Sequence, residues 1–210
     1  MDPSRMFPFA ADFAKRFGMV AVCPQYRLYK PDKSVTVFDC VKDARSSVRY
    51  TRAHAAELGI DPDKIVVSGA SAGGHLAVST ALFDDVYEET DDMAVPCLPN
   101  ALILYFPVID TSPEGYGQKK IGEEWKELSP AHNVRKGVPP TLTFHGTGDN
   151  TCPFEGAKLF HEEMLKAGNT SQLEVTEGGG HGYLIFDKDI YLDSLDKAEN
   201  FLKANGILEK

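Results

Sequence analysis

The chain has 210 residues, of which 42% are hydrophobic, and its 22 basic and 31 acidic residues give a formal net charge of -9 at pH 7. This size and apolar content suit a single domain over residues 1–210 that buries one substantial core. The negative charge argues against nucleic acid as a partner, and no apolar run approaches the length of a membrane span.

Helical and extended patterns alternate along the chain. In chain order we expect helix 2–17, strand 19–24, helix 35–58, strand 64–69, helix 72–83, strand 101–106, strand 140–145, helix 154–167, strand 172–176 and helix 189–204. This alternation predicts an α/β fold with a mostly parallel sheet that is covered by helices on both faces. Asp2 and Pro3 would start the first helix, and Gly59 would close the second.

Residues 69–73 read Gly-Ala-Ser-Ala-Gly between a predicted strand and a predicted helix. This pattern is typical of a nucleophile elbow, in which small neighbours let the chain turn sharply beneath an exposed serine. Ser71 is therefore the candidate nucleophile, and the amide of Ala72 is a candidate donor to an oxyanion. An ordinary glycine-rich turn with a capping serine is the plainer alternative.

An acid and a histidine follow two later strands. Asp149 lies in a glycine-containing loop after strand 140–145, and His181 lies in a glycine loop after strand 172–176. The carboxyl ends of parallel strands meet at one edge of a sheet, so these side chains can reach Ser71. The expected roles are base for His181 and orienting acid for Asp149.

Other candidate acids and histidines have simpler roles. Asp110 is the second candidate acid, but it also suits a turn cap with Ser112, and the glycine-flanked loop favours Asp149. The remaining histidines are expected to make a local hydrogen bond (His145), to pack under the elbow (His75) or to lie at the surface (His54, His132 and His161).

The sequence indicates no metal and no cofactor. The cysteines lack zinc-finger spacing, and neither a P-loop nor a dinucleotide-binding glycine pattern occurs. We expect Cys23 and Cys40 to be buried small apolar residues, whereas Cys152 lacks the elbow geometry of a nucleophile. The acidic stretch 84–92 suits a metal or a basic partner, and a solvated loop is the preferred interpretation.

Several of these motifs together resemble the α/β-hydrolase esterases of the hormone-sensitive-lipase-like group, especially its bacterial acetyl-esterase and acetylxylan-esterase-like branch. The matching segments extend over nearly the whole chain, at residues 24–28, 69–77, 128–132, 139–142, 145–149, 153–154 and 180–182. The resemblance implies the same roles for Ser71, Asp149 and His181. At Ala70 the chain departs from the pattern, because many relatives have Asp there.

The start of the sequence departs further from this group. Its members normally have several strands before the Tyr-Arg-Leu segment, here residues 26–28, and a glycine-rich loop whose amides complete the oxyanion hole. We therefore expect an α/β-hydrolase fold without the N-terminal strands. A truncated sequence, direct pairing of strands 19–24 and 64–69, and a strand from another chain are the alternatives. No signal peptide is present, but one could lie upstream, so no compartment is assigned.

The expected function is hydrolysis of short-chain acyl esters by a serine esterase. The resemblance extends this to acetyl esters on carbohydrates. Residues 111–138 form a candidate cap-like insertion, in which Tyr116 and Trp125 either wall a small pocket or anchor a long loop. A prolyl-peptidase-like serine peptidase and a non-catalytic or impaired α/β-hydrolase are the alternatives. Association into a homo-oligomer is left open.

Overall fold

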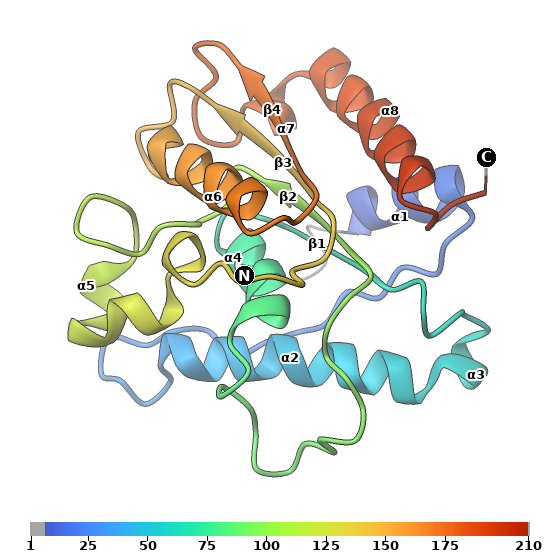
Figure 1. Cartoon of the computed structure of the whole chain (residues 1–210), viewed down its shortest axis with the longest axis horizontal. Helices are drawn as coiled ribbons and strands as arrows, with labels where there is room; N and C mark the ends of the chain where they lie inside the picture. Colours follow the sequence, from blue (N-terminus) through green and yellow to red (C-terminus); the bar gives the residue numbers. More distant parts are fainter. Residues whose placement is uncertain (1–6, 210) are drawn as a thin grey trace.

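A four-stranded parallel sheet forms the centre of the computed structural model, which describes residues 7–209 (Figure 1). Its strands are β1 (Val66–Ala70), β2 (Ala101–Tyr105), β3 (Thr141–Gly146) and β4 (Ser171–Thr176), and they lie side by side in chain order. Parallel strands need a crossover connection, and each crossover here contains at least one helix. The predicted parallel α/β sheet is confirmed.

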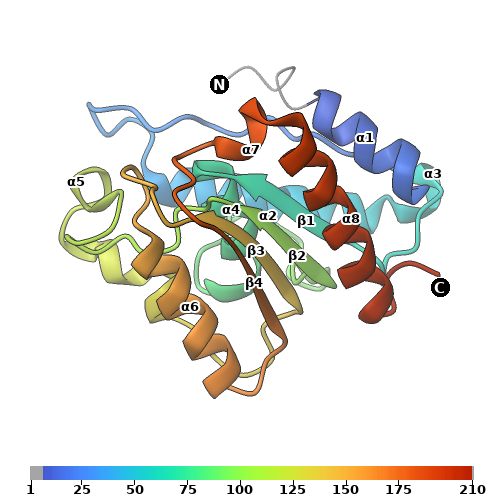
Figure 2. The same ribbon diagram turned by 90° about the horizontal axis from the view of Figure 1, so that it is seen from above.

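Helices cover both faces of the sheet, as Figure 2 shows from above. One face carries α1 (Phe7–Phe17) and α8 (Lys188–Ala204), and the other carries α4 (Ala72–Leu82) and α6 (Phe154–Lys166), with α2 (Val37–Ala53) packed on α4. The shorter elements are α3 (Ala55–Leu58), α5 (Gln118–Ile121), the 3-10 helices η2 (Glu123–Leu128) and η3 (Pro130–His132), and α7 (Tyr183–Phe186).

Strand β2 shows why the sheet is stable between two helical layers. Leu102 and Leu104 pack into the core beneath α4 and α6, whereas Ala101 and Ile103 face α1 and α8, and all four are fully buried. A strand covered on both faces needs a continuous apolar run rather than an alternating one. The sheet is thereby fixed as a rigid platform for the loops at its carboxyl edge.

The predicted helix 35–58 is two helices, because it breaks at His54. The Nδ1 atom of His54 lies 2.8 Å from the carbonyl oxygen of Tyr50, and the two rings stack with centroids 3.9 Å apart. The backbone N–H of His54 also donates to the Tyr50 carbonyl, at 3.0 Å, so the last helical bond of α2 and the ring contact meet at the same oxygen. Gly59 ends α3 in the left-handed conformation, with φ 66°, so the predicted closing residue is confirmed.

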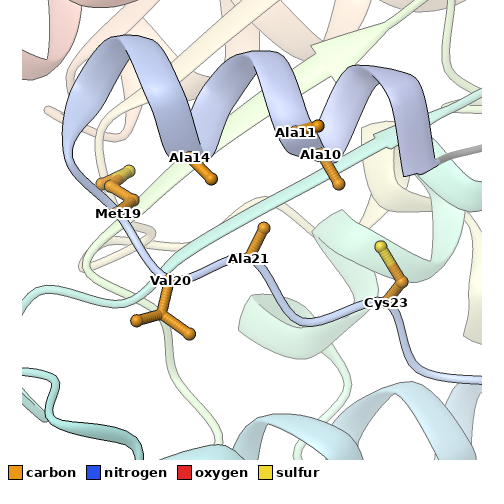
Figure 3. A pocket seen from close by; sticks show the side chains of 7 residues that line it. All are labelled: Ala10, Ala11, Ala14, Met19, Val20, Ala21 and Cys23. Atoms are coloured by element: carbon orange, nitrogen blue, oxygen red, sulfur yellow. The ribbon is translucent and has the colours of Figure 1, made fainter.

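The predicted strand 19–24 is wrong. These residues run extended, but they pair with no described strand, and β1 bonds only to β2 within residues 7–209. A cavity of about 490 Å³ opens between α1 and this segment, lined by Ala10, Ala11, Ala14, Met19, Val20, Ala21 and Cys23 (Figure 3). Direct pairing with β1 is therefore not observed, and Cys23 is partly exposed rather than buried. Asp2 and Pro3 lie outside the described residues.

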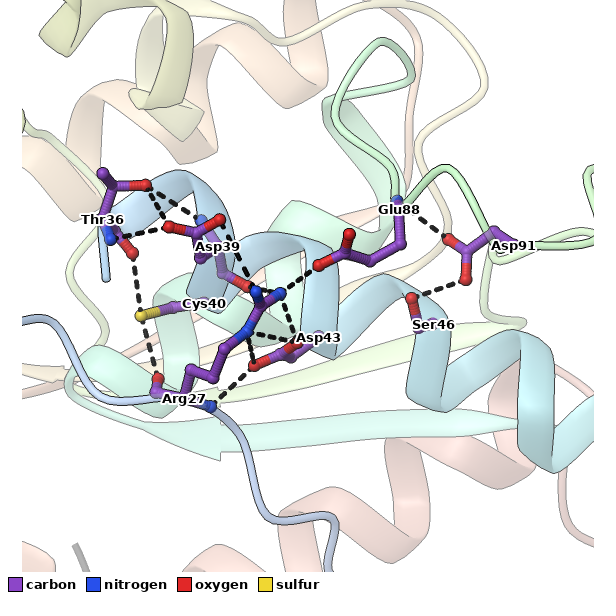
Figure 4. Close-up of polar contacts among 8 residues, drawn as sticks. All are labelled: Arg27, Thr36, Asp39, Cys40, Asp43, Ser46, Glu88 and Asp91. Atoms are coloured by element: carbon purple, nitrogen blue, oxygen red, sulfur yellow. Dashed lines mark hydrogen bonds and ion pairs between the residues drawn. The ribbon is translucent and has the colours of Figure 1, made fainter. Parts of the chain in front are cut away.

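The acidic stretch 84–92 is largely an exposed loop, but it is not simply solvated. Three of its carboxylates pair with arginines of this chain: Asp84 with Arg135, Glu88 with Arg27 and Asp91 with Arg49. Figure 4 shows Arg27 between Glu88 and the α2 carboxylates, and its backbone N–H also donates to Asp43. The loop, through Glu88, and α2, through Asp43, thus both hold the extended segment that carries Arg27.

No helix within residues 7–209 is both long enough and apolar enough to cross a bilayer.

Candidate active site

Ser71 occupies a strained turn between β1 and α4. Its backbone has φ 54° and ψ -120°, a region that residues with side chains rarely adopt. Two hydrogen bonds from the end of β2 hold this turn. The Ser71 N–H donates to the Tyr105 carbonyl, the Val108 N–H donates to the Ser71 carbonyl, and both distances are 3.0 Å.

Close contacts require glycine at two positions here, Gly69 within the Gly-Ala-Ser-Ala-Gly motif and Gly74 directly after it. A Cβ atom at Gly69 would lie 2.2 Å from the carbonyl oxygen of Gly73, and one at Gly74 would lie 2.7 Å from the Cβ of Pro107. Any larger residue at either position would push α4 away from the sheet. The motif therefore has the elbow geometry that its sequence predicted, and it presents Ser71 at the carboxyl edge.

The structure brings the three sequence-predicted side chains together. Nε2 of His181 lies 2.9 Å from Oγ of Ser71, and Nδ1 of His181 lies 2.8 Å from Oδ2 of Asp149. A carboxylate can only accept, so Nδ1 carries the proton and Nε2 turns its lone pair toward the serine hydroxyl. This tautomer is the one that a general base at Ser71 needs.

The carboxylate of Asp149 is fully buried, and both of its oxygens have hydrogen-bond partners. Its Oδ1 accepts the N–H groups of Thr151 at 2.9 Å and Cys152 at 2.8 Å, which leaves Oδ2 for His181. Backbone donors of this kind stabilise a buried negative charge. The acid is thereby held in one orientation relative to the imidazole.

The loops that carry Asp149 and His181 are joined to each other. The Gly148 N–H donates to the Gly179 carbonyl at 3.0 Å, and the Gly178 N–H donates to Oγ1 of Thr147 at 2.8 Å. A Cβ atom at Gly146 would lie 2.0 Å from the Gly179 oxygen, so the two backbones touch. This contact fixes the loop of Asp149 relative to the loop of His181.

Phe106 is a residue of the site that the sequence analysis missed. It directly follows β2, and its backbone φ of 35° is a positive value that bulky residues seldom adopt. Its ring meets the ring of His181 edge-on, with centroids 5.0 Å apart and planes at 74°. The signal in the sequence is its place immediately after a strand at the edge that carries Ser71.

Ala72 begins α4, so its N–H has no acceptor within the helix and is available to an oxyanion. Beneath the elbow, His75 is buried and its Nε2 lies 2.7 Å from the Leu128 carbonyl, in the packing position that the sequence predicted. Burial lowers the pKa of His75, which keeps the ring neutral.

Asp110 lies in a different network. It accepts the Ser112 N–H at 2.8 Å and the Ser112 hydroxyl at 3.0 Å, and it lies 3.7 Å from His132. Within residues 7–209 its carboxylate makes no hydrogen bond to His181. Asp110 therefore caps the turn after β2, while Asp149 is the carboxylate that contacts the histidine.

Tyr116 and Trp125 contact their own segment. The Tyr116 hydroxyl lies 3.1 Å from Nζ of Lys120, and the Trp125 ring meets the His132 ring edge-on at 5.2 Å. No hydrogen bond or ring contact in the described part of the chain joins either residue to Ser71 or His181. A role for them in a substrate pocket stays a prediction, as does the cap-like nature of residues 111–138.

Among residues 7–209, no group of three or more His, Cys, Asp or Glu side chains could hold a metal ion.

The chain matches one protein-family model and is similar to several known proteins. The BD-FAE family model matches residues 4–101. The apo structure of Thermogutta terrifontis esterase 2 superposes with a TM-score of 0.91 at 43% identity, covering 99% of this chain and 80% of that one. The same esterase with propionate or butyrate bound matches with TM-scores of 0.90 and 0.89, at 43% and 42% identity, and each match covers 99% of this chain and 79% of that one.

Two curated proteins match over shorter shares of their length. A probable isoprenylcysteine alpha-carbonyl methylesterase, ICMEL1 of Arabidopsis thaliana, is 28% identical over 78% of this chain and 39% of its own length. Endo-1,4-beta-xylanase B of Butyrivibrio fibrisolvens is 27% identical over 72% of this chain and 25% of its own length. The chain thus spans well under half of either protein.

Proposed function

Because the chain belongs to the α/β-hydrolase esterases of the hormone-sensitive-lipase-like group, we propose that it is a serine carboxylesterase that hydrolyses short-chain acyl esters. One contact supports this proposal above all, the 2.9 Å distance between Nε2 of His181 and Oγ of Ser71. Asp149 on the far nitrogen gives the imidazole the tautomer that accepts the serine proton.

The proposed reaction is acyl transfer in two steps. The Ser71 hydroxyl proton passes to His181 as Oγ attacks the ester carbonyl carbon, and the Ala72 N–H donates to the oxyanion. The imidazolium then protonates the leaving alcohol as the C–O bond breaks, which leaves the acyl group on Ser71. His181 next takes a proton from water, the resulting hydroxide attacks the acyl carbon, and the proton returns to Oγ as the acid leaves.

The proposed acyl groups are short. The structures of Thermogutta terrifontis esterase 2 with propionate and with butyrate support this range for a protein of the same group. Acetyl groups on carbohydrates are the finer proposal, and the match to part of a protein named a xylanase supports the carbohydrate part of it. Within this proposal residues 111–138 would overhang the site, with Tyr116 and Trp125 as candidate walls of the acyl or sugar pocket.

An impaired hydrolase is the second candidate. One observation favours it: among residues 7–209, Ala72 is the single amide at the elbow that we identify as an oxyanion donor. Loss of one donor costs about a hundredfold to a thousandfold in turnover, so such a chain would be slow without being inert. The esterase names of the relatives favour either candidate over a serine peptidase.

Hydrolysis of p-nitrophenyl acetate, butyrate and octanoate by the chain and by Ser71→Ala tests the proposal. We expect Ser71-dependent hydrolysis that is faster for acetate and butyrate than for octanoate. A slow but Ser71-dependent rate would identify the impaired hydrolase. Equal rates for the two proteins on all three esters would refute both candidates.

A further inference from the structure

His145 is a buried ionisable residue next to the triad that the proposed reaction does not use. It lies on β3 and its side chain is fully buried. Its Nε2 atom lies 2.8 Å from the Cys152 carbonyl oxygen and 3.4 Å from Oδ2 of Asp149. That same oxygen contacts Nδ1 of His181, so two imidazoles lie against one carboxylate oxygen.

The contacts define the tautomer of His145. A carbonyl oxygen can only accept, so Nε2 carries a hydrogen. Burial is the main cause that lowers the pKa of His145, although the bond to the Cys152 carbonyl, Asp149 and Glu155 favour the charged ring, and His181 opposes it. The ring is therefore neutral, and its Nδ1 is buried without a hydrogen-bond partner in the described part of the chain.

The Nε2–H group joins β3 to the turn that encloses the acid. Cys152 donates its N–H to Oδ1 of Asp149, and its own carbonyl accepts from His145. Pro153 follows at the start of α6 and has no N–H to offer. Among the contacts of this turn, the bond from His145 is the one that ties its far end back to the strand that leads into Asp149.

We propose that His145 is a positioning residue for the acid. Its neutral Nε2–H holds the Asp149–Cys152 turn and orients Oδ2 toward His181, and the N–H dipole faces that oxygen. The ring makes no contact with Ser71, so it takes no part in proton transfer. This inference rests on the proposed esterase function and deepens it, because it explains how the buried acid keeps one orientation.

Two amide substitutions of His145 distinguish the role of its Nε2–H from that of the rest of the ring. Glutamine places an amide nitrogen near the position of Nε2. Asparagine places it near Nδ1, which makes no hydrogen bond in the described part of the wild-type chain. We expect His145→Gln to keep kcat close to that of the wild type. His145→Asn should lower kcat by about tenfold to a hundredfold, the scale of a small misplacement of a catalytic group.

The Michaelis constant distinguishes positioning from substrate binding. Because His145 does not face the substrate, KM should stay close to that of the wild type in both variants. Circular dichroism and thermal melts establish that each variant is folded at the assay temperature. If His145→Asn does not fold, His145→Phe replaces it, since phenylalanine keeps a ring of similar size but offers no donor.

The result that supports the inference is rescue by glutamine with loss in asparagine or phenylalanine. Wild-type kcat in His145→Asn, or equal loss in the glutamine and asparagine variants, would overturn the role of the Nε2–H. These outcomes are distinct from failure of the esterase function itself. Wild-type protein with no Ser71-dependent hydrolysis would overturn the proposed function and this inference with it.

Discussion

The ring of Phe106 meets the ring of His181 edge-on, with centroids 5.0 Å apart. Phe106 pairs its backbone N–H with the Phe144 carbonyl at 2.7 Å and is 3% exposed, so it is a fixed wall. Asp149 restrains one nitrogen of the imidazole, and this wall restrains rotation of the ring. The His181 ring is thus held by a hydrogen bond and by packing.

Replacing the Phe106 ring should let the His181 ring move more freely. We expect Phe106→Leu to lower kcat by about tenfold on p-nitrophenyl acetate, because His181 can then rotate away from Ser71. Phe144→Leu is the matched control, since its ring stacks on Tyr105 on the sheet. It should cost stability without changing kcat of the folded protein. Equal kcat values for the Phe106 variant and the wild type would show that the Phe106 ring does not restrain His181.

The contact between the acid and base loops makes a second prediction. Gly146→Ala places a methyl group into the Gly179 carbonyl, and the backbone there has to move. We expect a loss of about a hundredfold in kcat, together with about 1 to 3 kcal/mol of stability. Steady-state kinetics and urea unfolding measure the two effects.

Gly180→Ala controls for that substitution. A Cβ atom at Gly180 meets nothing within 4 Å, although the residue lies beside His181 in the same loop. This variant should keep nearly full activity. If the two alanine variants lose activity equally, the Gly146–Gly179 contact does not set the distance between acid and base.

Acid should destabilise the fold through His75. Burial lowers the pKa of His75 below its ordinary value of 6.5, so the unfolded chain binds a proton there that the folded chain refuses. The free energy of unfolding therefore decreases as the pH falls through about 6.5 and continues to decrease toward the folded pKa. At pH values above that range this contribution to the pH dependence vanishes.

His75→Gln provides the comparison, because glutamine can keep the bond to the Leu128 carbonyl but does not titrate. Urea unfolding at about pH 8 and about pH 5.5 should show that the wild type loses up to about 1.4 kcal/mol more than the variant. Identical losses in the two proteins would show that His75 does not contribute to the acid sensitivity.

The elbow and its partners could be predicted because their signals are local or follow from topology. Small residues around Ser71 indicate a tight turn between a strand and a helix. Parallel strands bring the loops of Asp149 and His181 to one edge. The sheet register ends with Ala70 beside Tyr105 and Tyr105 beside Phe144, so Ser71 and Phe106, each one residue beyond its strand, follow at the level of His145 on β3. Strand order thus explains the meeting of residues far apart in the chain.

Other features depend on tertiary contacts that the sequence does not reveal. Residues 19–24 have strand-like composition, but a strand also needs a neighbour to bond, and none is present among residues 7–209. The helix breaks at His54, where the ring of that residue lies 2.8 Å from the Tyr50 carbonyl oxygen, a contact that the sequence does not reveal. The positive φ of Phe106 contradicts the preference of an aromatic residue, so only the surrounding fold explains it.

Covalent labelling of Ser71 tests the central claim most directly. The folded chain is incubated with paraoxon, whose phosphorus would be attacked by Oγ with loss of p-nitrophenolate, and the adduct is located by peptide mass spectrometry. We predict one diethylphosphoryl group on Ser71, formed much more slowly in His181→Gln and absent from Ser71→Ala. A lack of adduct in the wild type, or the same adduct in Ser71→Ala, would contradict the assignment of Ser71 as the activated nucleophile.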